Sequence, residues 1–317
     1  MLEKFGLPVL LVVLILYFSF SLPGTFNTPA NWRAIAISQA ALAVAAMALM
    51  FPLVAGRFDI SVGANVGVCS IMTAACMSRY DLDLVWAILV SIAVGSLIGL
   101  INGVIIAYLG VNSIITTLGV SIVLGGFVQA YTGGVPISEN LSPTLTDLSR
   151  TAFAQVPVLF LIMAGIAVAV NVFFRHTAFG RTLEATGANE VAARLNGMPV
   201  RRVVASSFVL AGLLAGVAGV LQVASQGNGN PSVGGISYIL PPLAAVFLGA
   251  TTIRPGTYNV PGTIIALFFV GVAVSGLAIM GVEPWVTDVL NGGAVIVAVS
   301  LSAQFRRRRT GTAELGS

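Results

Sequence analysis

The chain has 317 residues, of which 57% are hydrophobic and only 8% are charged. Its mean hydropathy is +1.00, whereas an average soluble domain carries about 25% charged residues. These values predict a single membrane domain over residues 1–317 and exclude a large soluble domain. A net charge of +4 without a basic stripe also excludes a nucleic-acid-binding protein.

Ten segments are long and apolar enough to cross a membrane, since a spanning helix needs about 20 mostly apolar residues. They are residues 7–22, 34–54, 60–78, 84–108, 112–132, 155–174, 203–225, 236–252, 262–281 and 284–303. The first segment has a weakly charged start and a poor cleavage site, so we expect a retained helix and not a signal peptide. The fold class is therefore all-α and polytopic.

The basic residues set the orientation, because lysine and arginine are retained in cytoplasmic loops. With the N-terminus inside and ten crossings, most of them are cytoplasmic. They are Lys4, Arg57, Arg175, Arg181, Arg194, Arg201, Arg202, Arg254 and Arg306 to Arg309, against Arg33, Arg79 and Arg150 outside. Both termini are then cytoplasmic, and the basic tail at 304–317 can meet anionic lipid headgroups.

Asp59, Ser61 and Gly63 lie where the third span begins. One interpretation is a polar break that lines or gates a transport path, since interrupted helices mark transporter sites. The alternative is that Asp59 or Ser61 caps the third helix at the cytoplasmic surface. The residues alone leave both open.

Small and polar residues are scattered through the spans. Gly95, Gly99 and Gly103 share one helix face, and Gly212 and Gly216 repeat the spacing, which favours close helix packing. Polar side chains inside the spans usually face a bundle interior or a water-filled path. They are Gln39, Asn65, Asn102, Thr116, Thr117, Gln129, Asn171, Gln222 and Asn291. Together they suggest a route for a polar, uncharged solute, and the alternative for each is a hydrogen bond between helices.

Two polar connections are expected outside the membrane, at 133–154 and 226–235. The first begins a helix at Ser142-Pro143, and the second is rich in glycine and asparagine, which predicts a flexible turn. They are candidates for receiving a solute-loaded protein, or are ordinary connecting loops.

The longest cytoplasmic connection, 175–202, predicts a short helix from Asn189 to Asn196. Asn189 is a good N-cap, and Gly197 followed by Pro199 is a stop signal. Val191 and Leu195 lie four residues apart and share one apolar face. Such a helix either docks into a groove on a partner or is a solvated loop helix.

Three motifs in this chain resemble the ribose-type sugar permeases of ATP-binding-cassette (ABC) importers. The first runs from His176 to Gly197 and contains Glu190-Val-Ala-Ala-Arg-Leu-Asn-Gly197. The second is Asp59-Ile-Ser-Val-Gly63, and the third is Ala244-Ala-Val-Phe-Leu-Gly-Ala-Thr251 followed by Gly262-Thr263. The likeness covers roughly residues 30–300 and keeps the order of the motifs.

The resemblance implies a permease subunit in a bacterial inner membrane, with two five-helix halves in inverted orientation. Its partners would be a cytoplasmic ATPase, an extracytoplasmic solute-binding protein, a second permease chain and the lipid bilayer. The chain itself would hold no cofactor or metal and be no enzyme, with ATP and magnesium on the ATPase. Residues implied to couple to the ATPase are Glu190, Ala192, Ala193, Arg194, Leu195 and Gly197. Candidates for the path are Asp59, Ser61, Gly63, Asn65, Asn102, Thr116, Thr117 and Gln129.

Two other function classes compete with this interpretation. An ion-coupled secondary transporter needs buried ionisable groups, and here only Asp59, Glu283 and Asp288 lie near the membrane. A membrane enzyme is disfavoured because Lys4 is the only lysine, His176 is the only histidine and no carboxylate pair is clustered.

Overall fold

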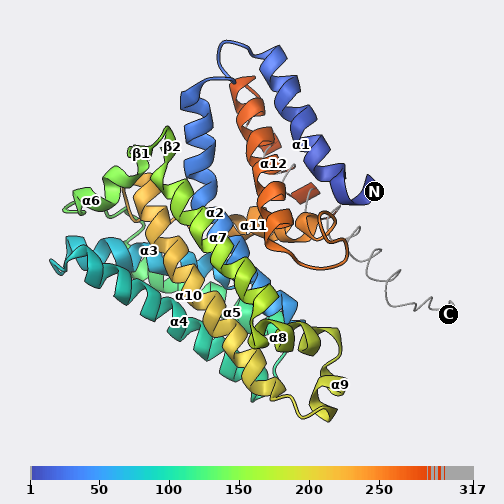
Figure 1. Cartoon of the computed structure of the whole chain (residues 1–317). Coiled ribbons are helices and arrows are strands. Elements are labelled where there is room, and N and C mark those ends of the chain that lie inside the picture. The colour runs from blue at the N-terminus through green and yellow to red at the C-terminus, as the bar shows by residue number, and fades with distance from the viewer. Residues whose placement is uncertain (1, 284, 287–288, 290–291, 294–295, 297–317) are drawn as a thin grey trace. The chain divides into compact units, whose positions relative to one another are not determined.

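The computed structural model describes residues 2–283, 285–286, 289, 292–293 and 296, and its elements are helical apart from one very short hairpin (Figure 1). The long helices are α1 (Leu2–Ser21), α2 (Pro29–Val54), α3 (Val62–Ser78), α4 (Leu84–Ala107), α5 (Ser113–Thr132), α7 (Val158–His176), α10 (Val200–Gln226), α11 (Gly235–Gly249) and α12 (Val260–Ile279). The short elements are α6 (Pro143–Thr146), the 3-10 turn η1 (Asp147–Ser149), β1 (Ala152–Phe153), β2 (Val156–Pro157), α8 (Ala178–Ala188) and α9 (Glu190–Leu195).

The long helices coincide with the first nine predicted spans, and the chain is a polytopic all-α membrane protein. Six of them are long and apolar enough to cross a bilayer: α2, α4, α5, α7, α10 and α12. Shorter apolar helices occupy Phe5–Ser21, Val62–Ser78 and Ser237–Gly249. The tenth predicted span, 284–303, falls outside the described residues except at a few positions, and the tail at 304–317 falls outside them entirely.

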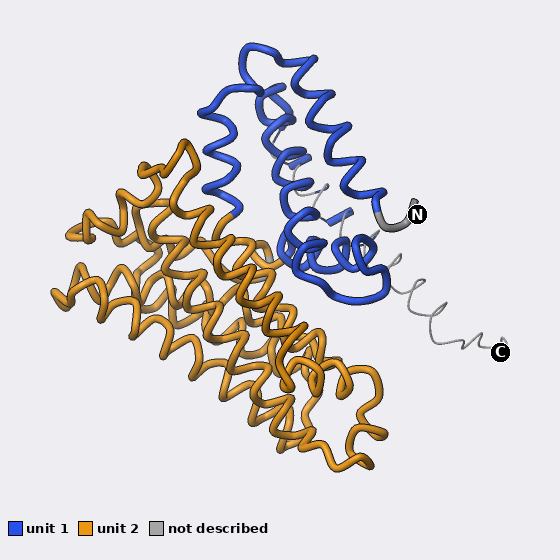
Figure 2. The backbone as a smooth tube through the Cα atoms, viewed as in Figure 1, with its two compact units in different colours: residues 1–39, 240–317 blue, residues 40–239 orange. Residues whose placement is uncertain are grey.

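Two compact units make up the chain (Figure 2). One is formed by residues 1–39 and 240–317, and the other by residues 40–239. In the first unit Phe18 and Phe26 are buried with Ile35 and Val272. Gly276 leaves room for the Phe18 ring, since a Cβ there would collide with it.

The second unit is built around α10, which lies along α4 and α3 (Figure 1). The predicted packing of the glycine series is confirmed. A Cβ at Gly99 would collide with the Phe208 carbonyl, and one at Gly95 with the Gly212 carbonyl. Ser91 adds a polar contact, donating from Oγ to the Cys69 carbonyl at 3.1 Å and to the Gly216 carbonyl at 3.3 Å.

The connections at 133–154 and 226–235, predicted to lie outside, are joined by backbone pairing. Ile137 and Gly229 exchange both N–H···O bonds at 2.9 Å in an antiparallel bridge. The turn at 226–235, expected to be flexible, is therefore tied to the connection at 133–154. The latter is also more structured than expected, since it contains α6, η1 and strand β1, which pairs with β2 just after it.

Candidate functional site

The connection between α7 and α10 folds into two successive helices. Thr177 caps α8 by accepting a hydrogen bond on Oγ1 from the Gly180 N–H at 3.0 Å. A Cβ at Gly180 would meet the Phe173 and Phe174 carbonyls at 2.6 Å, so glycine permits the tight turn from α7. The sequence did not predict α8, because its glycines and polar residues were taken for a loop.

The predicted short helix is α9, and its ends form as expected. Asn189 Oδ1 accepts from the Ala192 N–H at 2.9 Å. Gly197 has φ +76°, with its N–H bonded to the Arg194 carbonyl at 3.0 Å and the Met198 N–H bonded to the Ala193 carbonyl at 3.1 Å. These two bonds form a Schellman motif, in which glycine avoids the strain of a left-handed conformation.

Helix α9 has one face that packs against the chain and an opposite apolar face that is exposed. Ala193 is buried in a cluster with Ile106, Val200, Val204 and Phe208, which fixes α9 on the ends of α4 and α10. In contrast, the apolar side chains on the opposite face are exposed: Val191 is 69% exposed and Leu195 is 84% exposed. Both apolar side chains are therefore not covered by other described residues of this chain.

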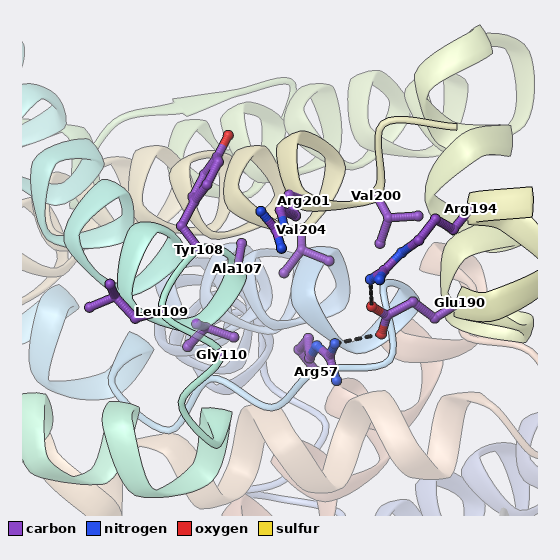
Figure 3. Close-up of a pocket in the computed structure, with 11 residues that line it drawn as sticks. Arg57, Ala107, Tyr108, Leu109, Gly110, Glu190, Arg194, Val200, Arg201 and Val204 are labelled. Carbon is purple, nitrogen blue, oxygen red and sulfur yellow. Dashed lines mark hydrogen bonds and ion pairs between the residues drawn. The ribbon is translucent and has the colours of Figure 1, made fainter. Parts of the chain in front are cut away.

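The charged side chains of α9 point back into the protein (Figure 3). The Glu190 carboxylate accepts from Arg194 at 2.9 Å along the helix and from Arg57 at 2.6 Å. The sequence left open whether Glu190 and Arg194 pair or reach outward, and the structure shows that they pair. Arg57, which the sequence treated only as an orientation signal, is the site residue that was missed.

A polar cavity of about 310 Å³ opens beside this ion pair (Figure 3). Its lining combines the end of α4 with the start of α10 and the charged side of α9. The residues are Arg57, Ile106, Ala107, Tyr108, Leu109, Gly110, Glu190, Arg194, Val200, Arg201 and Val204.

Four of the predicted path residues meet at a second polar cluster, which we name the polar node: Asp59, Ser61, Asn102 and Thr117. Asp59 Oδ1 accepts from the Ser61 N–H at 3.0 Å and from Ser61 Oγ at 2.6 Å. Asn102 Nδ2 donates to Ser61 Oγ at 2.7 Å, and Thr117 Oγ1 accepts from the Ile60 N–H at 3.0 Å. The node joins the starts of α3 and α5 to the last two turns of α4.

The environment of Asp59 differs from that of a surface cap. Asp59 is only 4% exposed, which favours a buried polar break over a cap at an exposed surface. Ser61 occupies the N-cap position but makes no capping hydrogen bond through its side chain. Burial raises the pKa of Asp59 to about 6, although hydrogen bonds from Ser61 oppose the shift.

The other four path candidates lie outside the node. Asn65 Nδ2 donates to the Gly95 carbonyl at 3.1 Å, one turn along α3. Gly63 is a packing position, since a Cβ there would meet the Gly235 carbonyl at 2.6 Å. Thr116 Oγ1 donates to the Asn112 carbonyl of its own helix at 2.9 Å, and Gln129 is exposed.

The third sequence motif is a close crossing of α11 and α12. A Cβ at Gly249 would collide with the backbone of Thr263. Asn259 holds this crossing, donating from Nδ2 to the Gly249 and Thr252 carbonyls at 3.1 Å and accepting from the Gly262 N–H at 2.8 Å. These contacts explain why the motif is rich in small residues.

Comparison with known proteins gives the same family as the motifs. The family described as the branched-chain amino acid transport system / permease component matches residues 31–299. The autoinducer 2 import system permease protein LsrD of Photorhabdus temperata is 29% identical over 302 residues, covering 93% of this chain and 90% of that protein. The protein named Probable ABC transporter permease protein YphD of Escherichia coli (strain K12) is 34% identical over 301 residues, covering 94% and 88%. The ribose import permease protein RbsC of the same strain is 28% identical over 260 residues, covering 81% and 80%.

No solved structure gave a significant match to the chain. A permease component does not hydrolyse ATP itself, so a separate ATPase supplies the energy. An ABC importer also includes a solute-binding protein, which is the second partner. The chain belongs to the branched-chain amino acid transport system / permease component family and is the multi-pass membrane subunit of a bacterial ABC importer.

Proposed function

We propose that this permease carries a sugar or a closely related small hydroxylated solute into the cell. The observation that carries the proposal is the similarity over most of the chain to permeases named for ribose and autoinducer 2. Carboxylates for ion coupling are scarce in the spans, which disfavours a secondary transporter.

The coupling residues divide into two groups in this proposal. Val191 and Leu195 form the apolar surface that inserts into a groove of the ATPase. The other coupling residues determine the shape of α9 and how it packs against the rest of the chain. They are Glu190, Ala192, Ala193, Arg194 and Gly197. This division follows from the exposure of the first pair and the inward contacts of Glu190 and Ala193.

The assembled importer contains two permease chains with ten spans each and both termini in the cytoplasm. The two five-helix halves of each chain are inverted repeats. The connections at 133–154 and 226–235 receive the solute-binding protein, and the Ile137–Gly229 bridge makes them one surface.

Reconstitution tests the source of energy. Liposomes containing the permease with its ATPase should accumulate ribose when binding protein is added outside and ATP is trapped inside. The permease alone should accumulate nothing under a proton or sodium gradient. Uptake by the permease alone under such a gradient would establish the secondary transporter instead.

Thiol labelling tests the orientation. Thr144 and Ser232 are exposed on the proposed outer surface, and Glu184 is exposed on α8. An impermeant thiol reagent added to intact cells should label Thr144→Cys and Ser232→Cys but not Glu184→Cys. The native cysteines, Cys69 and Cys76, are buried and give little background. Labelling of Glu184→Cys in intact cells would contradict the ten-span topology.

A further inference from the structure

We propose that Arg57 is a positioning residue that transmits the movement of helix α9 to the polar node. The inference rests on the proposed function, because it takes α9 to be the segment that the ATPase moves. It adds a mechanical route, from α9 through the end of α2 to the starts of α3 and α5.

The segment α8–α9 is attached to the end of α2 at two adjacent points. At the first, Gly187 lies so close to Val54 and Gly56 that a Cβ on Gly187 would collide with the Val54 carbonyl. At the second, Arg57 donates to Glu190 at 2.6 Å, a contact between residues 133 positions apart in the sequence. The first attachment is a close contact between two backbones. The second is a single ion pair between side chains.

The backbone around Arg57 is well suited to pass on a displacement. Gly56 has φ +76°, and its N–H bonds to the Leu53 carbonyl at 3.1 Å. The Arg57 N–H bonds to the Pro52 carbonyl at 2.8 Å, which completes a Schellman motif at the end of α2. A pull on the Arg57 side chain therefore acts on a hydrogen-bonded backbone and not on a loose loop.

The residues that follow Arg57 enter the polar node directly. The Phe58 N–H donates to Ser113 Oγ at 3.2 Å, and the Ile60 N–H donates to Thr117 Oγ1 at 3.0 Å. Asp59 is bonded to Ser61, and Ser61 to Asn102. The contacts with α5 and α4 are thus made by the four residues that directly follow Arg57, and these residues lead into α3.

Stability does not account for the Arg57–Glu190 pair. Both side chains are 36% exposed, and ion pairs at such sites contribute little to stability. Arg57 Nε is buried without a hydrogen-bond partner among the described residues, so the guanidinium is not fully satisfied in this arrangement. A weak, single contact of this kind can break and re-form as α9 moves.

A charge exchange tests the proposal. Arg194 also contacts Glu190, so all variants carry Arg194→Gln, which prevents Arg194 from repelling an arginine introduced at position 190. The series is Arg57→Glu, Glu190→Arg and the two together. Arg202→Glu is the matched control, because Arg202 is exposed and lies outside the cavity beside the pair.

Two readouts separate positioning from folding. The first is ribose uptake per ATP hydrolysed by the whole importer in proteoliposomes. The second is the fluorescence of bimane attached to Thr116→Cys, next to the node, after addition of ATPase and ATP. Because the second needs no solute, it still reports on Arg57 if ribose is the wrong substrate.

Each single exchange should lower uptake per ATP about tenfold, within the range of measured pair couplings, and remove the ATP-dependent bimane change. The double exchange should restore both, and Arg202→Glu should leave both unaltered. The proposal is overturned if the single variants keep the bimane change, or if the double variant stays as defective as the single ones. If the parent shows no ribose uptake but a normal bimane response, ribose is the wrong substrate class, and the role of Arg57 is still supported.

Discussion

The bundle of α3, α4 and α10 and the segment α8–α9 are held in place by different means. In the bundle, glycines let backbones touch, as at Gly99 against Phe208 and Gly95 against Gly212. The segment α8–α9 has two such contacts, at Gly180 and Gly187, and both are in α8. Helix α9 itself depends on a half-exposed ion pair and on Ala193. Close backbone contacts resist displacement, whereas the contacts of α9 can shift at little cost. We therefore expect the bundle to be the rigid part of this unit and α9 to be the part that moves.

The largest effect is expected in the bundle. Gly99→Val would place side-chain atoms on the Phe208 carbonyl, and neither backbone can retreat without parting α4 from α10. We expect no monodisperse protein in size-exclusion chromatography of a fluorescent fusion. Gly125→Val on α5 is the matched control, because a Cβ there meets nothing within 4 Å. Equal behaviour of the two variants would refute the rigid-bundle interpretation.

The second effect concerns the exposed face of α9. Val191→Glu with Leu195→Glu places two charges on the surface proposed to enter the ATPase. We expect a folded permease with normal membrane levels, while co-purification of the ATPase and uptake fall at least about tenfold. Phe153→Glu is the control, since Phe153 is 73% exposed on the hairpin. Retained ATPase binding in the α9 variant would move the interface elsewhere.

Much of this contrast follows from the sequence. Hydropathy predicted the nine described long helices, and the four-residue glycine spacing predicted close packing of the helices that became α4 and α10. Helix α8 was missed because 175–202 was interpreted as a polar connection with one short helix, whereas Gly180 and Gly187 are contact points with neighbouring backbone. The glycine signal is the same in both cases, and only the tertiary neighbours distinguish a break from a close approach.

The candidate sites also contain parts that local sequence predicts and parts that depend on tertiary contacts. Asn189 and Gly197 have local signals, so the ends of α9 could be predicted. The Arg57–Glu190 pair joins distant parts of the chain, and no local pattern marks it. The node was predicted as a set of polar residues, but its membership depends on which side chains face inward, so Thr117 enters while its neighbour Thr116 bonds to its own helix.

The third effect is a pH dependence at the junction of the two regions. The pKa of Asp59 is raised to about 6, so the folded state holds this proton more tightly than the unfolded state. The resulting stabilisation is present below the unfolded pKa of 3.8 and is lost as the pH rises through about 6. Its upper bound is about 3 kcal/mol, from 1.36 kcal/mol per pK unit.

Melting curves in detergent at pH 5 and pH 7.5 measure this dependence. Asp59→Asn keeps an oxygen acceptor for Ser61 but cannot ionise. The melting temperature of the parent relative to this variant should fall between pH 5 and pH 7.5. An unchanged difference between the two proteins would show that Asp59 does not titrate in this range.

A smaller effect is expected at the end of α9. Gly197 has φ +76°, and a side chain in this conformation costs roughly 1–2 kcal/mol. Gly197→Val should tilt α9, reduce uptake several-fold and leave insertion intact. Gly197→Asn should retain most activity, because asparagine tolerates the left-handed conformation better. If the two variants are equally active, the angle of α9 does not matter for coupling.

The smallest effect is expected at Arg194. Its contact with Glu190 at 2.9 Å lies along one helix, and Arg194 is 62% exposed in its side chain. Exposed pairs at this spacing contribute about 0.3–0.5 kcal/mol, so Arg194→Gln should keep uptake within about twofold of the parent. Arg57→Gln removes a charge from the same carboxylate, but it breaks the link between α9 and α2 and should reduce uptake about tenfold. Side-by-side uptake assays at equal expression compare the two. Similar losses would mean that Glu190 needs only a positive neighbour, whereas a loss confined to Arg57→Gln identifies the connection to α2 as the part of the pair that transport requires.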